Sequence, residues 1–224
     1  MDLQLAGKRA IVTGASRGIG YAVAAALAAE GADLVLVARD QAALDAAAER
    51  LARPGRRVLA VAADTTDDHA VRAMADRTVT ELGGVDILVN AAAQPGGASP
   101  ARGLAELADD DLRTEIETKV LGDLRCARAV APSMSARGWG RIINISGLAA
   151  RQTGSVFGSI RNVAVAAMTK NLADELGPSG ISIGRLVTAA EVADVVTFLA
   201  SPRSVAITGD AIAVGGGTRH VIHY

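Results

Sequence analysis

The sequence has few aromatic residues and a single cysteine. Only 2% of its 224 residues are aromatic while 50% are hydrophobic, so Ala, Val, Leu and Ile must build the core. Cys126 has no second cysteine to pair with. This excludes an internal disulfide and fits a reducing, cytoplasmic location. We interpret the thiol as packing on a helix rather than as a nucleophile.

The sequence also lacks a charge imbalance and a long apolar run. Its net charge of −1 argues against general attraction to nucleic acid or to an anionic membrane. We expect no signal peptide, because MDLQLAGKRA has no basic segment followed by an apolar one. No apolar run is long enough to span a bilayer, and the Ala-rich stretch 22–29 ends at Glu30. No His, Cys and acidic residues show metal-ligand spacing, so we expect no metal.

Short apolar runs alternate with helical stretches along the chain. The expected strands are 8–13, 33–38, 56–63, 85–90, 140–146, 180–183 and 210–214. One long helix is expected over 107–138 and another from about 154 to Leu176. Apolar strands separated by helices indicate a parallel sheet covered on both faces. Right-handed crossovers then give a doubly wound, Rossmann-type α/β fold with seven strands in a single domain, residues 1–224.

A glycine-rich turn follows the first expected strand and opens the first helix. The turn reads TGASRGIG over residues 13–20. Glycines let the backbone approach a pyrophosphate, and the helix N-terminus offers free N–H groups and a partial positive charge to the phosphates. The candidate cofactor residues in this turn are Gly14, Ser16, Arg17, Gly18, Ile19 and Gly20.

The spacing G-x-x-x-G-x-G resembles that of the short-chain dehydrogenase/reductase family. Similar motifs follow in order: Asp64 after the third strand, DILVNAAA at 86–93, GRIINIS at 140–146 and ITGDAIAVGGG at 207–217. The resemblance implies NAD(P)-dependent oxidoreduction of a small-molecule alcohol or carbonyl, usually by dimers or tetramers. We therefore expect a homodimer or homotetramer, joined through the Ala-rich helices at 104–136 and 154–176.

The charges around the turn favour NADP over NAD. An acid at the end of the second strand would hold the ribose hydroxyls of NAD, but Ala38 stands there, followed by Arg39. Arg39 and Arg17 can clamp a 2′-phosphate with forked hydrogen bonds. Asp40 is the rival ribose ligand, but it is better explained as a helix cap. The resemblance also implies that Asp64 and Thr65 border the adenine and that Asn90 and Ala91 approach the nicotinamide-side ribose.

The family's catalytic residues are a tyrosine, a lysine four residues later, a serine and an asparagine. AMTKNLADEL at 167–176 is similar to the helix that follows the tyrosine–lysine pair. Counting back from it puts Gly158 at the tyrosine place and Asn162 at the lysine place. The serine place falls at Ser146 or Gly147, and the asparagine place at Lys119.

Another group must therefore supply the proton if the chain is an enzyme. Lys119 could donate with a pKa lowered by burial, and Arg161 could stabilise an oxyanion. Ser146 and Asn162 complete the catalytic candidates. Lys119 and Arg161 can equally be solvated helix charges, and the nearby Ser155 can be a helix N-cap.

The family's sixth strand leads through a Pro-Gly turn into a lid that closes over substrate. Here residues 179–186 pass straight to the helix expected at 188–200. A substrate lid after about residue 183 is therefore either absent or omitted from the printed sequence, which is then numbered across the gap. Two functions stay open: an NADP-dependent oxidoreductase with atypical catalytic residues, or an inactive NADP-binding pseudoenzyme that serves as a sensor or oligomer partner.

Overall fold

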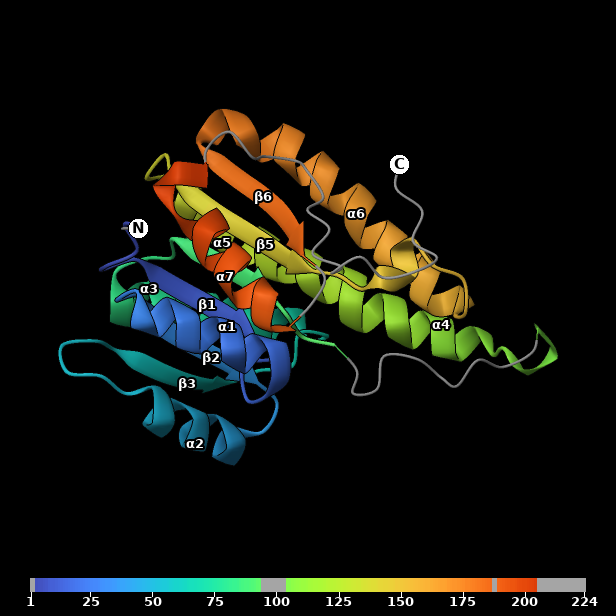
Figure 1. Cartoon of the computed structure of the whole chain (residues 1–224), viewed down its shortest axis with the longest axis horizontal. Helices are drawn as coiled ribbons and strands as arrows, with labels where there is room; N and C mark the ends of the chain where they lie inside the picture. Colours follow the sequence, from blue (N-terminus) through green and yellow to red (C-terminus); the bar gives the residue numbers. More distant parts are fainter. Residues whose placement is uncertain (1–2, 94–103, 187–188, 205–224) are drawn as a thin grey trace.

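A computed structural model of the chain describes residues 3–93, 104–186 and 189–204. A parallel β-sheet lies between two layers of helices (Figure 1). Its strand order is β3-β2-β1-β4-β5-β6. The strands are β1 (Arg9–Thr13), β2 (Asp33–Ala38), β3 (Val58–Ala62), β4 (Ile87–Asn90), β5 (Gly140–Ile145) and β6 (Ile181–Leu186). The Rossmann-type parallel sheet is confirmed, and its strand order reverses between β1 and β4.

The described part of the chain contributes six strands to this sheet. The seventh expected strand, at 210–214, lies outside the described residues. β6 is longer than the strand expected at 180–183. It pairs with β5 along its whole length, from the pair Gly140–Ile181 to the pair Ile145–Leu186.

Helices cover both faces of the sheet. The α-helices are α1 (Gly18–Ala29), α2 (Gln41–Leu51), α3 (Asp68–Leu82), α4 (Asp109–Glu115), α5 (Gly122–Ser135), α6 (Val156–Leu176) and α7 (Ala189–Ala200). The shorter helical segments are η1 (Leu104–Glu106), η2 (Ile116–Leu121), η3 (Leu148–Ala150), η4 (Gly177–Ser179) and η5 (Pro202–Ser204).

The continuous helix expected over 107–138 is interrupted. Its regular part begins at Asp109, where three successive acidic side chains suit the positive end of the helix dipole. Over η2 the winding becomes π-helical before α5 begins at Gly122. A π-turn changes the direction of the side chains around it and is frequent at functional sites. Lys119 lies in this turn and is only 4% exposed, so it is not the solvated charge that a regular surface helix would present.

Side-chain caps fix the starts of three helices. Asp40 accepts a hydrogen bond from the Ala43 N–H at 3.1 Å, which confirms it as the cap of α2. Asp67 accepts from two N–H groups at the start of α3. Ser155 accepts from Gly158 N–H at 3.0 Å and caps α6, also as expected. Each such cap stabilises its helix by about 1 kcal/mol.

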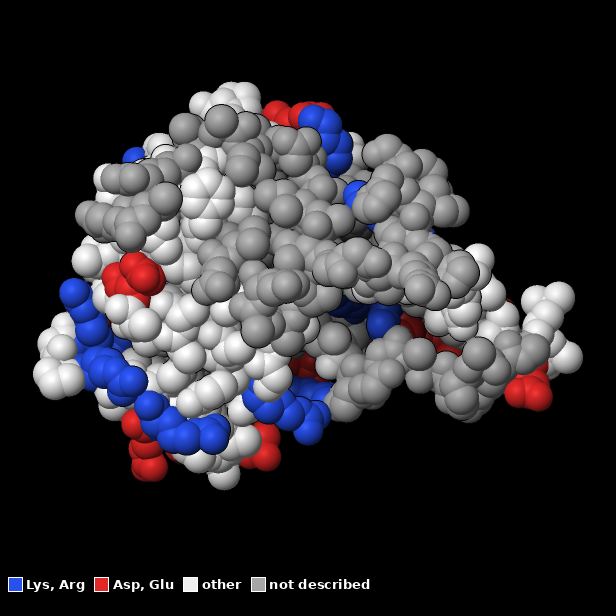
Figure 2. All heavy atoms as spheres, viewed as in Figure 1, with Lys and Arg blue, Asp and Glu red and all other residues white. Residues whose placement is uncertain are grey.

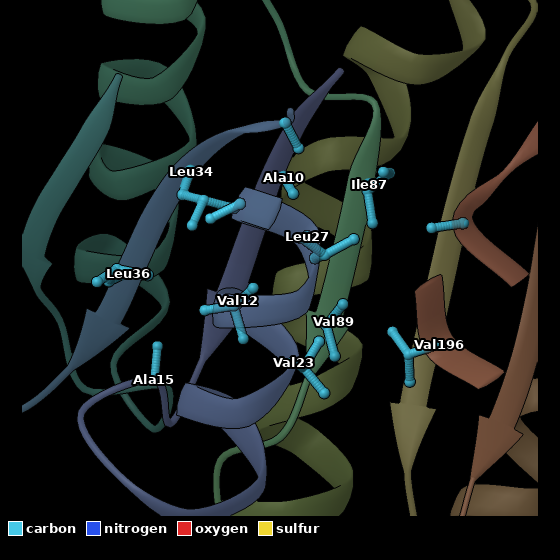
Figure 3. Packing of buried hydrophobic residues seen from close by; sticks show 14 of the residues in the cluster. Ala10, Val12, Ala15, Val23, Leu27, Leu34, Leu36, Ile87, Val89 and Val196 are labelled. Carbon is cyan, nitrogen blue, oxygen red and sulfur yellow. The ribbon is translucent and has the colours of Figure 1, made fainter. Parts of the chain in front are cut away.

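The hydrophobic core forms two clusters, one on each face of the sheet. The first packs α1, α2 and α7 on the sheet, and Figure 3 shows Val23 and Leu27 of α1 beside Val12, Val89 and Val196. The second packs α3 and α5 on the opposite face. Neighbouring strand residues enter different clusters, because successive side chains of a strand point to opposite faces. Both faces are thus buried in aliphatic side chains, as the low aromatic content requires.

Charged residues are mixed on the surface. Figure 2 shows Lys and Arg atoms next to Asp and Glu atoms along the lower edge of the displayed face, around α2. This mixture agrees with the net charge of −1.

Candidate functional site

The first helix begins with unused hydrogen-bond donors at the carboxyl edge of the sheet. β1 ends at Thr13 and α1 starts at Gly18, with Arg17 as its N-cap. Arg17 makes no side-chain cap, and the first turn of α1 contains no acidic residue. The first-turn N–H groups and the positive end of the helix dipole are therefore left for an anion.

The glycines of this turn meet different surroundings. A Cβ atom on Gly14 would lie 2.8 Å from the Ala91 carbonyl oxygen, and one on Gly20 would lie 2.7 Å from the Gly14 carbonyl carbon. These two glycines allow the turn to pack on β4 and on itself. A Cβ on Gly18 would meet nothing within 4 Å, and its φ is +58°. Gly18 thus presents open backbone in a conformation that favours glycine.

Thr13 ties the turn to the loop after β4. Its hydroxyl oxygen accepts hydrogen bonds from the N–H groups of Ala91, at 3.0 Å, and Ala92, at 3.1 Å. The ends of β1 and β4 are held together at the point where the strand order reverses. In open α/β sheets such a switch point opens a crevice for ligands.

A cavity of about 760 Å³ lies at this switch point. Ten of the eleven residues expected at the cofactor line it: Gly14, Ser16, Arg17, Gly18, Ile19, Gly20, Arg39, Asp64, Thr65 and Ala91. The lining also includes Thr118 from the π-turn, which the sequence analysis missed. The signal for Thr118 in the sequence was its position next to Lys119. Spacing in a regular helix did not fix the direction of the Thr118 side chain, so this signal could not be used.

The eleventh residue, Asn90, does not line the cavity. It is fully buried, and its Nδ2 donates to Asn144 Oδ1 at 2.9 Å and to the Asp123 carbonyl at 3.2 Å. Asn144 in turn donates to Thr169 Oγ1 at 3.0 Å. A polar chain thus crosses from β4 through β5 to α6, and Asn90 supports the wall of the site.

Two exposed cations stand at the rim of the cavity. Among the described residues, neither Arg17 nor Arg39 has a hydrogen-bond or ion-pair partner. Ala38 is the last residue of β2 and directly precedes Arg39. Asp40 also lines the cavity, with one carboxylate oxygen committed to capping α2. The rim therefore offers the positive charges of two arginines, with Asp40 as its acidic residue next to Arg39, partly committed to the cap of α2.

Ser146, which follows β5, and Asn162 of α6 contact one another. Ser146 Oγ donates to Asn162 Oδ1 at 2.9 Å, and Gly147 N–H donates to the same oxygen at 2.7 Å. Asn162 Nδ2 donates to the Gly158 carbonyl at 2.7 Å. Ser146 is 5% exposed and Asn162 is 2% exposed. Asn162 thereby clamps the end of β5 to the first turn of α6.

Lys119 is held inside the protein. Its Nζ lies 3.3 Å from Asp123 Oδ2, and it makes a long hydrogen bond of 3.5 Å to the Ala92 carbonyl. Ala92 lines the cavity, so the amine lies directly behind its wall. Burial raises the pKa of Asp123 to about 7, although the charge and hydrogen bond of Lys119 act in the opposite direction.

Arg161 does not join Ser146 and Asn162. Its guanidinium forms an ion pair with Glu115 at the end of α4, and the residue is 9% exposed. Adjacent helix residues point about 100° apart, which separates Arg161 from the Asn162 clamp. Its charge is therefore used to hold α4 against α6.

A family profile described as short chain dehydrogenase matches residues 8–200. The chain belongs to the short-chain dehydrogenase family. Among curated short-chain dehydrogenases and reductases, it is 32% identical over 246 residues to the short-chain reductase protein NovJ from Streptomyces niveus, covering 93% of this chain and 92% of that protein. It is 34% identical over 240 residues to cis-4-hydroxycyclohexanecarboxylate dehydrogenase from Sinomonas cyclohexanicum, covering 93% and 95%.

Solved structures agree with the family assignment. The L-sorbose reductase from Gluconobacter frateurii, complexed with NADPH and L-sorbose, superimposes with a TM-score of 0.90 at 30% identity, over 97% of this chain and 98% of that one. Family membership indicates oxidoreduction with a nicotinamide cofactor. Within the described residues no helix is both long and apolar enough to cross a membrane. Those residues also bring no three His, Cys, Asp or Glu side chains together as a metal would require.

Proposed function

We propose that this chain is an NADP-dependent short-chain oxidoreductase that acts on an alcohol/carbonyl pair with an altered set of catalytic residues. The observation that carries the proposal is the pair of guanidiniums, Arg17 and Arg39, which line the cavity near Ala38 and have no partner in the part of the chain that the structure describes. Two such cations can bind a 2′-phosphate through charge-assisted hydrogen bonds. An acid at Ala38 would instead favour the free ribose hydroxyls of NAD. The NADPH-bound L-sorbose reductase supports this choice.

The cavity fits such a cofactor. The uncapped first turn of α1 and the open backbone at Gly18 suit a pyrophosphate. Asp64 and Thr65 would border the adenine, and Ala91 would approach the nicotinamide-side ribose. When bound, the nicotinamide supplies the hydride equivalent. The chain must then orient the substrate and provide a proton.

We infer that Gly158 and Asn162 take the places of the family's tyrosine and lysine. A Cβ on Gly158 would lie 2.8 Å from Ser155 Oγ, the group that caps α6. A tyrosine would therefore require the cap to move. A Cβ on Gly147 would lie 3.2 Å from Asn162 Nδ2, so Ser146 is the better candidate for the serine that orients substrate.

Lys119 is the proposed proton donor. It lies behind the cavity wall at Ala92 and carries an exchangeable proton. Arg161 is the weaker candidate, because a guanidinium does not give up its proton in proteins and this one faces Glu115. Loss of a positioned general acid costs about 10²–10⁴ in rate.

Calorimetric titration with NADPH and NADH tests the cofactor, and the loss of NADPH absorbance with a panel of carbonyl compounds tests turnover. We expect NADPH to bind at least about tenfold more tightly than NADH, which corresponds to about 1.4 kcal/mol. We also expect turnover with part of the panel, reduced about 10²–10⁴-fold in Lys119→Met. Equal affinity for both coenzymes would contradict the phosphate clamp.

The second candidate function is an NADP-binding protein without turnover, either a sensor or an oligomer partner. The Asn162 clamp favours it, because Ser146, Gly147 and Gly158 already use the polar groups of this amide. Tight NADPH binding with no turnover across the carbonyl panel would establish this function in place of the first.

The connection after β6 bears on the substrate. β6 ends at Leu186 and α7 begins at Ala189. The alignment with NovJ spans 246 positions while this chain has 224 residues, so the relative has residues without counterparts here. We propose that these include a substrate lid after about residue 183. The intact mass of the purified protein decides between a deleted lid and one missing from the printed sequence.

We also propose a homodimer or homotetramer, with a cytoplasmic location as a prediction from the sequence. Val156, Ile160 and Val163 of α6 are 54%, 42% and 52% exposed. Their spacing of four and three residues puts them on one helix face. Exposed apolar side chains grouped on one face suit an interface, and sedimentation velocity measures the resulting mass.

A further inference from the structure

Asp123 is a buried carboxyl group for which the proposed reaction has so far given no role. It lies one helical turn after Lys119, and the two side chains are 2% and 6% exposed. The Asp123 carbonyl accepts the hydrogen bond from Asn90 Nδ2, which fixes this turn of α5 to the end of β4. The carboxyl group and the amine are therefore both held in place behind the cavity.

Few other titratable groups act on this pair. On the same helix, burial and the charge of Asp123 raise the pKa of the Cys126 thiol to about 12, so it stays protonated near neutral pH. Arg125 is engaged by Glu117 at 2.6 Å. Among the described residues, Lys119 is the only charged side chain that influences the pKa of Asp123.

A buried pair of this kind binds its protons jointly. Isolated charges are costly in the interior, so each group depends on the protonation state of the other. Burial raises the pKa of Asp123 to about 7 even with Lys119 beside it. The pair can therefore gain or lose a proton near neutral pH, which an exposed lysine or aspartate cannot do.

We propose that Asp123 positions the Lys119 amine against Ala92 and shares its proton, so that the pair is the proton store of the reaction centre. This inference rests on the proposed function. In reduction, the carbonyl carbon receives hydride from NADPH, which becomes NADP⁺, and the carbonyl oxygen receives a proton from the Lys119 ammonium. The amine left behind regains a proton from solvent through the pair. In oxidation, the neutral amine takes the hydroxyl proton.

Asp123→Asn tests the inference through the pH dependence of both directions. Without the carboxylate, the buried ammonium of Lys119 loses its counter-charge, so the neutral amine is favoured relative to the wild type. The basic limb of the reduction profile should therefore move to lower pH, with a loss of about tenfold or more at neutral pH. The acidic limb of the oxidation profile should also move to lower pH, so oxidation persists at a pH where the wild type has lost it. A packing defect alone would slow both directions and leave both limbs in place.

Asp174→Asn is the matched control. Asp174 pairs with Lys170 at the same i, i+4 spacing, but both side chains are exposed, at 68% and 62%. Its pH profiles should coincide with those of the wild type. If Asp123→Asn also leaves both limbs unmoved while turnover persists, the inference is overturned.

A second measurement does not depend on turnover. The ¹³C resonance of the Asp123 carboxyl group, assigned by its loss in Asp123→Asn, should titrate near neutral pH and move to higher pH in Lys119→Met. Titration near the ordinary aspartate pKa of about 4, unmoved in Lys119→Met, would overturn the shared proton. Absence of turnover in the wild type would instead overturn the proposed function, and the resonance would still decide whether the pair shares its proton.

Discussion

Two groups of residues lie near the carboxyl ends of the strands, and their polar groups differ in how far they are engaged. We call the turn after β1 with Arg17 and Arg39 the cofactor half, and Ser146, Asn162 and Lys119 the reaction half. At the end of β1, the first-turn N–H groups of α1 and the guanidiniums of Arg17 and Arg39 are left without partners among the described residues. At the end of β5, Ser146 is bound to Asn162. Lys119, next to the Ala92 carbonyl, is bound to Asp123. An open donor can bind a ligand at once, whereas an engaged one must first give up a protein partner.

The difference separates binding from chemistry. The cofactor half needs no rearrangement to accept a dinucleotide, so affinity should be retained whatever the catalytic outcome. The reaction half is stabilised by its own hydrogen bonds, so the groups that hold it together are the same groups that catalysis would use. Changes in the two halves should therefore alter different measured quantities.

The largest effect is expected for Asn162→Ala. The substitution leaves Ser146 Oγ, Gly147 N–H and the Gly158 carbonyl without their common partner in a site that is 2% exposed. Buried groups without partners cost about 1–3 kcal/mol each, and partial relaxation should leave a loss of about 3 kcal/mol in the free energy of unfolding. Thermal denaturation should show a Tm lower by about 6–12 °C.

Asn171→Ala is the control on the same helix. Asn171 is exposed, and within the described residues its Nδ2 donates to the Ala167 carbonyl one turn earlier. Its Tm should stay within about 2 °C of the wild type. NADPH affinity should be unchanged in both variants, and a large loss of affinity in Asn162→Ala would break the separation between the two halves.

The double variant Arg17→Ala, Arg39→Ala should show the reverse pattern. In the proposed function each guanidinium makes charge-assisted bonds to the 2′-phosphate, so their joint loss should weaken NADPH binding about 30-fold, or about 2 kcal/mol. NADH affinity and Tm should change little, because neither side chain has a partner among the described residues. Arg53→Ala controls for the loss of one positive charge elsewhere on the surface, since the exposed Arg53 guanidinium donates, among the described residues, to its neighbour's carbonyl. Similar losses for both coenzymes in the double variant would contradict the clamp.

The residues that line the cavity could largely be predicted from the sequence, because they lie in short local segments at the ends of strands. The glycine spacing with the helix start is one short segment and the Ala38–Arg39 dipeptide is another, and in a parallel sheet the carboxyl ends of β1 and β2 bring the two segments to one cavity. Asn90 is the exception, because its direction depends on Asn144 and Asp123, which are distant in the sequence.

The reaction half could be predicted much less well. Counting along the sequence places Lys119 and Asn162 on helices, but not the π-turn that directs Lys119 inward or the clamp that occupies Asn162. The proposed role of Asp123 depends on a 3.3 Å contact between its carboxylate in α5 and Lys119 in the π-helical segment. Side-chain direction in an irregular helix is set by tertiary packing, so spacing alone could not show it.

The ion pair of Arg9 with Asp86 lies away from both halves, and we expect it to have a smaller effect, on stability alone. Arg9 holds Asp86 at the amino end of β1 and β4, through Nε at 2.6 Å and Nη2 at 2.7 Å. Burial alone would raise the pKa of Asp86, but the hydrogen bonds and charge of Arg9 outweigh it and lower the pKa below the ordinary value. Such a depressed pKa adds stability above the unfolded-state value of about 4, and this stability is lost as pH falls through the folded-state pKa.

The wild type should therefore lose part of its unfolding free energy through Asp86 as the pH falls through the folded-state pKa, below about 4. Asp86→Asn should abolish this part of the pH dependence, as measured by urea unfolding at several pH values. Asp110→Asn, at a fully exposed ion pair with Arg113, should leave the profile unchanged. Asp86 lies at the amino ends of β1 and β4, whereas the cavity lies at the carboxyl ends of the strands. Asp86→Asn should therefore leave the NADPH affinity unchanged. A loss of affinity there would show that general destabilisation reaches the cofactor half, and the effects of Asn162 and the two arginines would then have to be corrected for it.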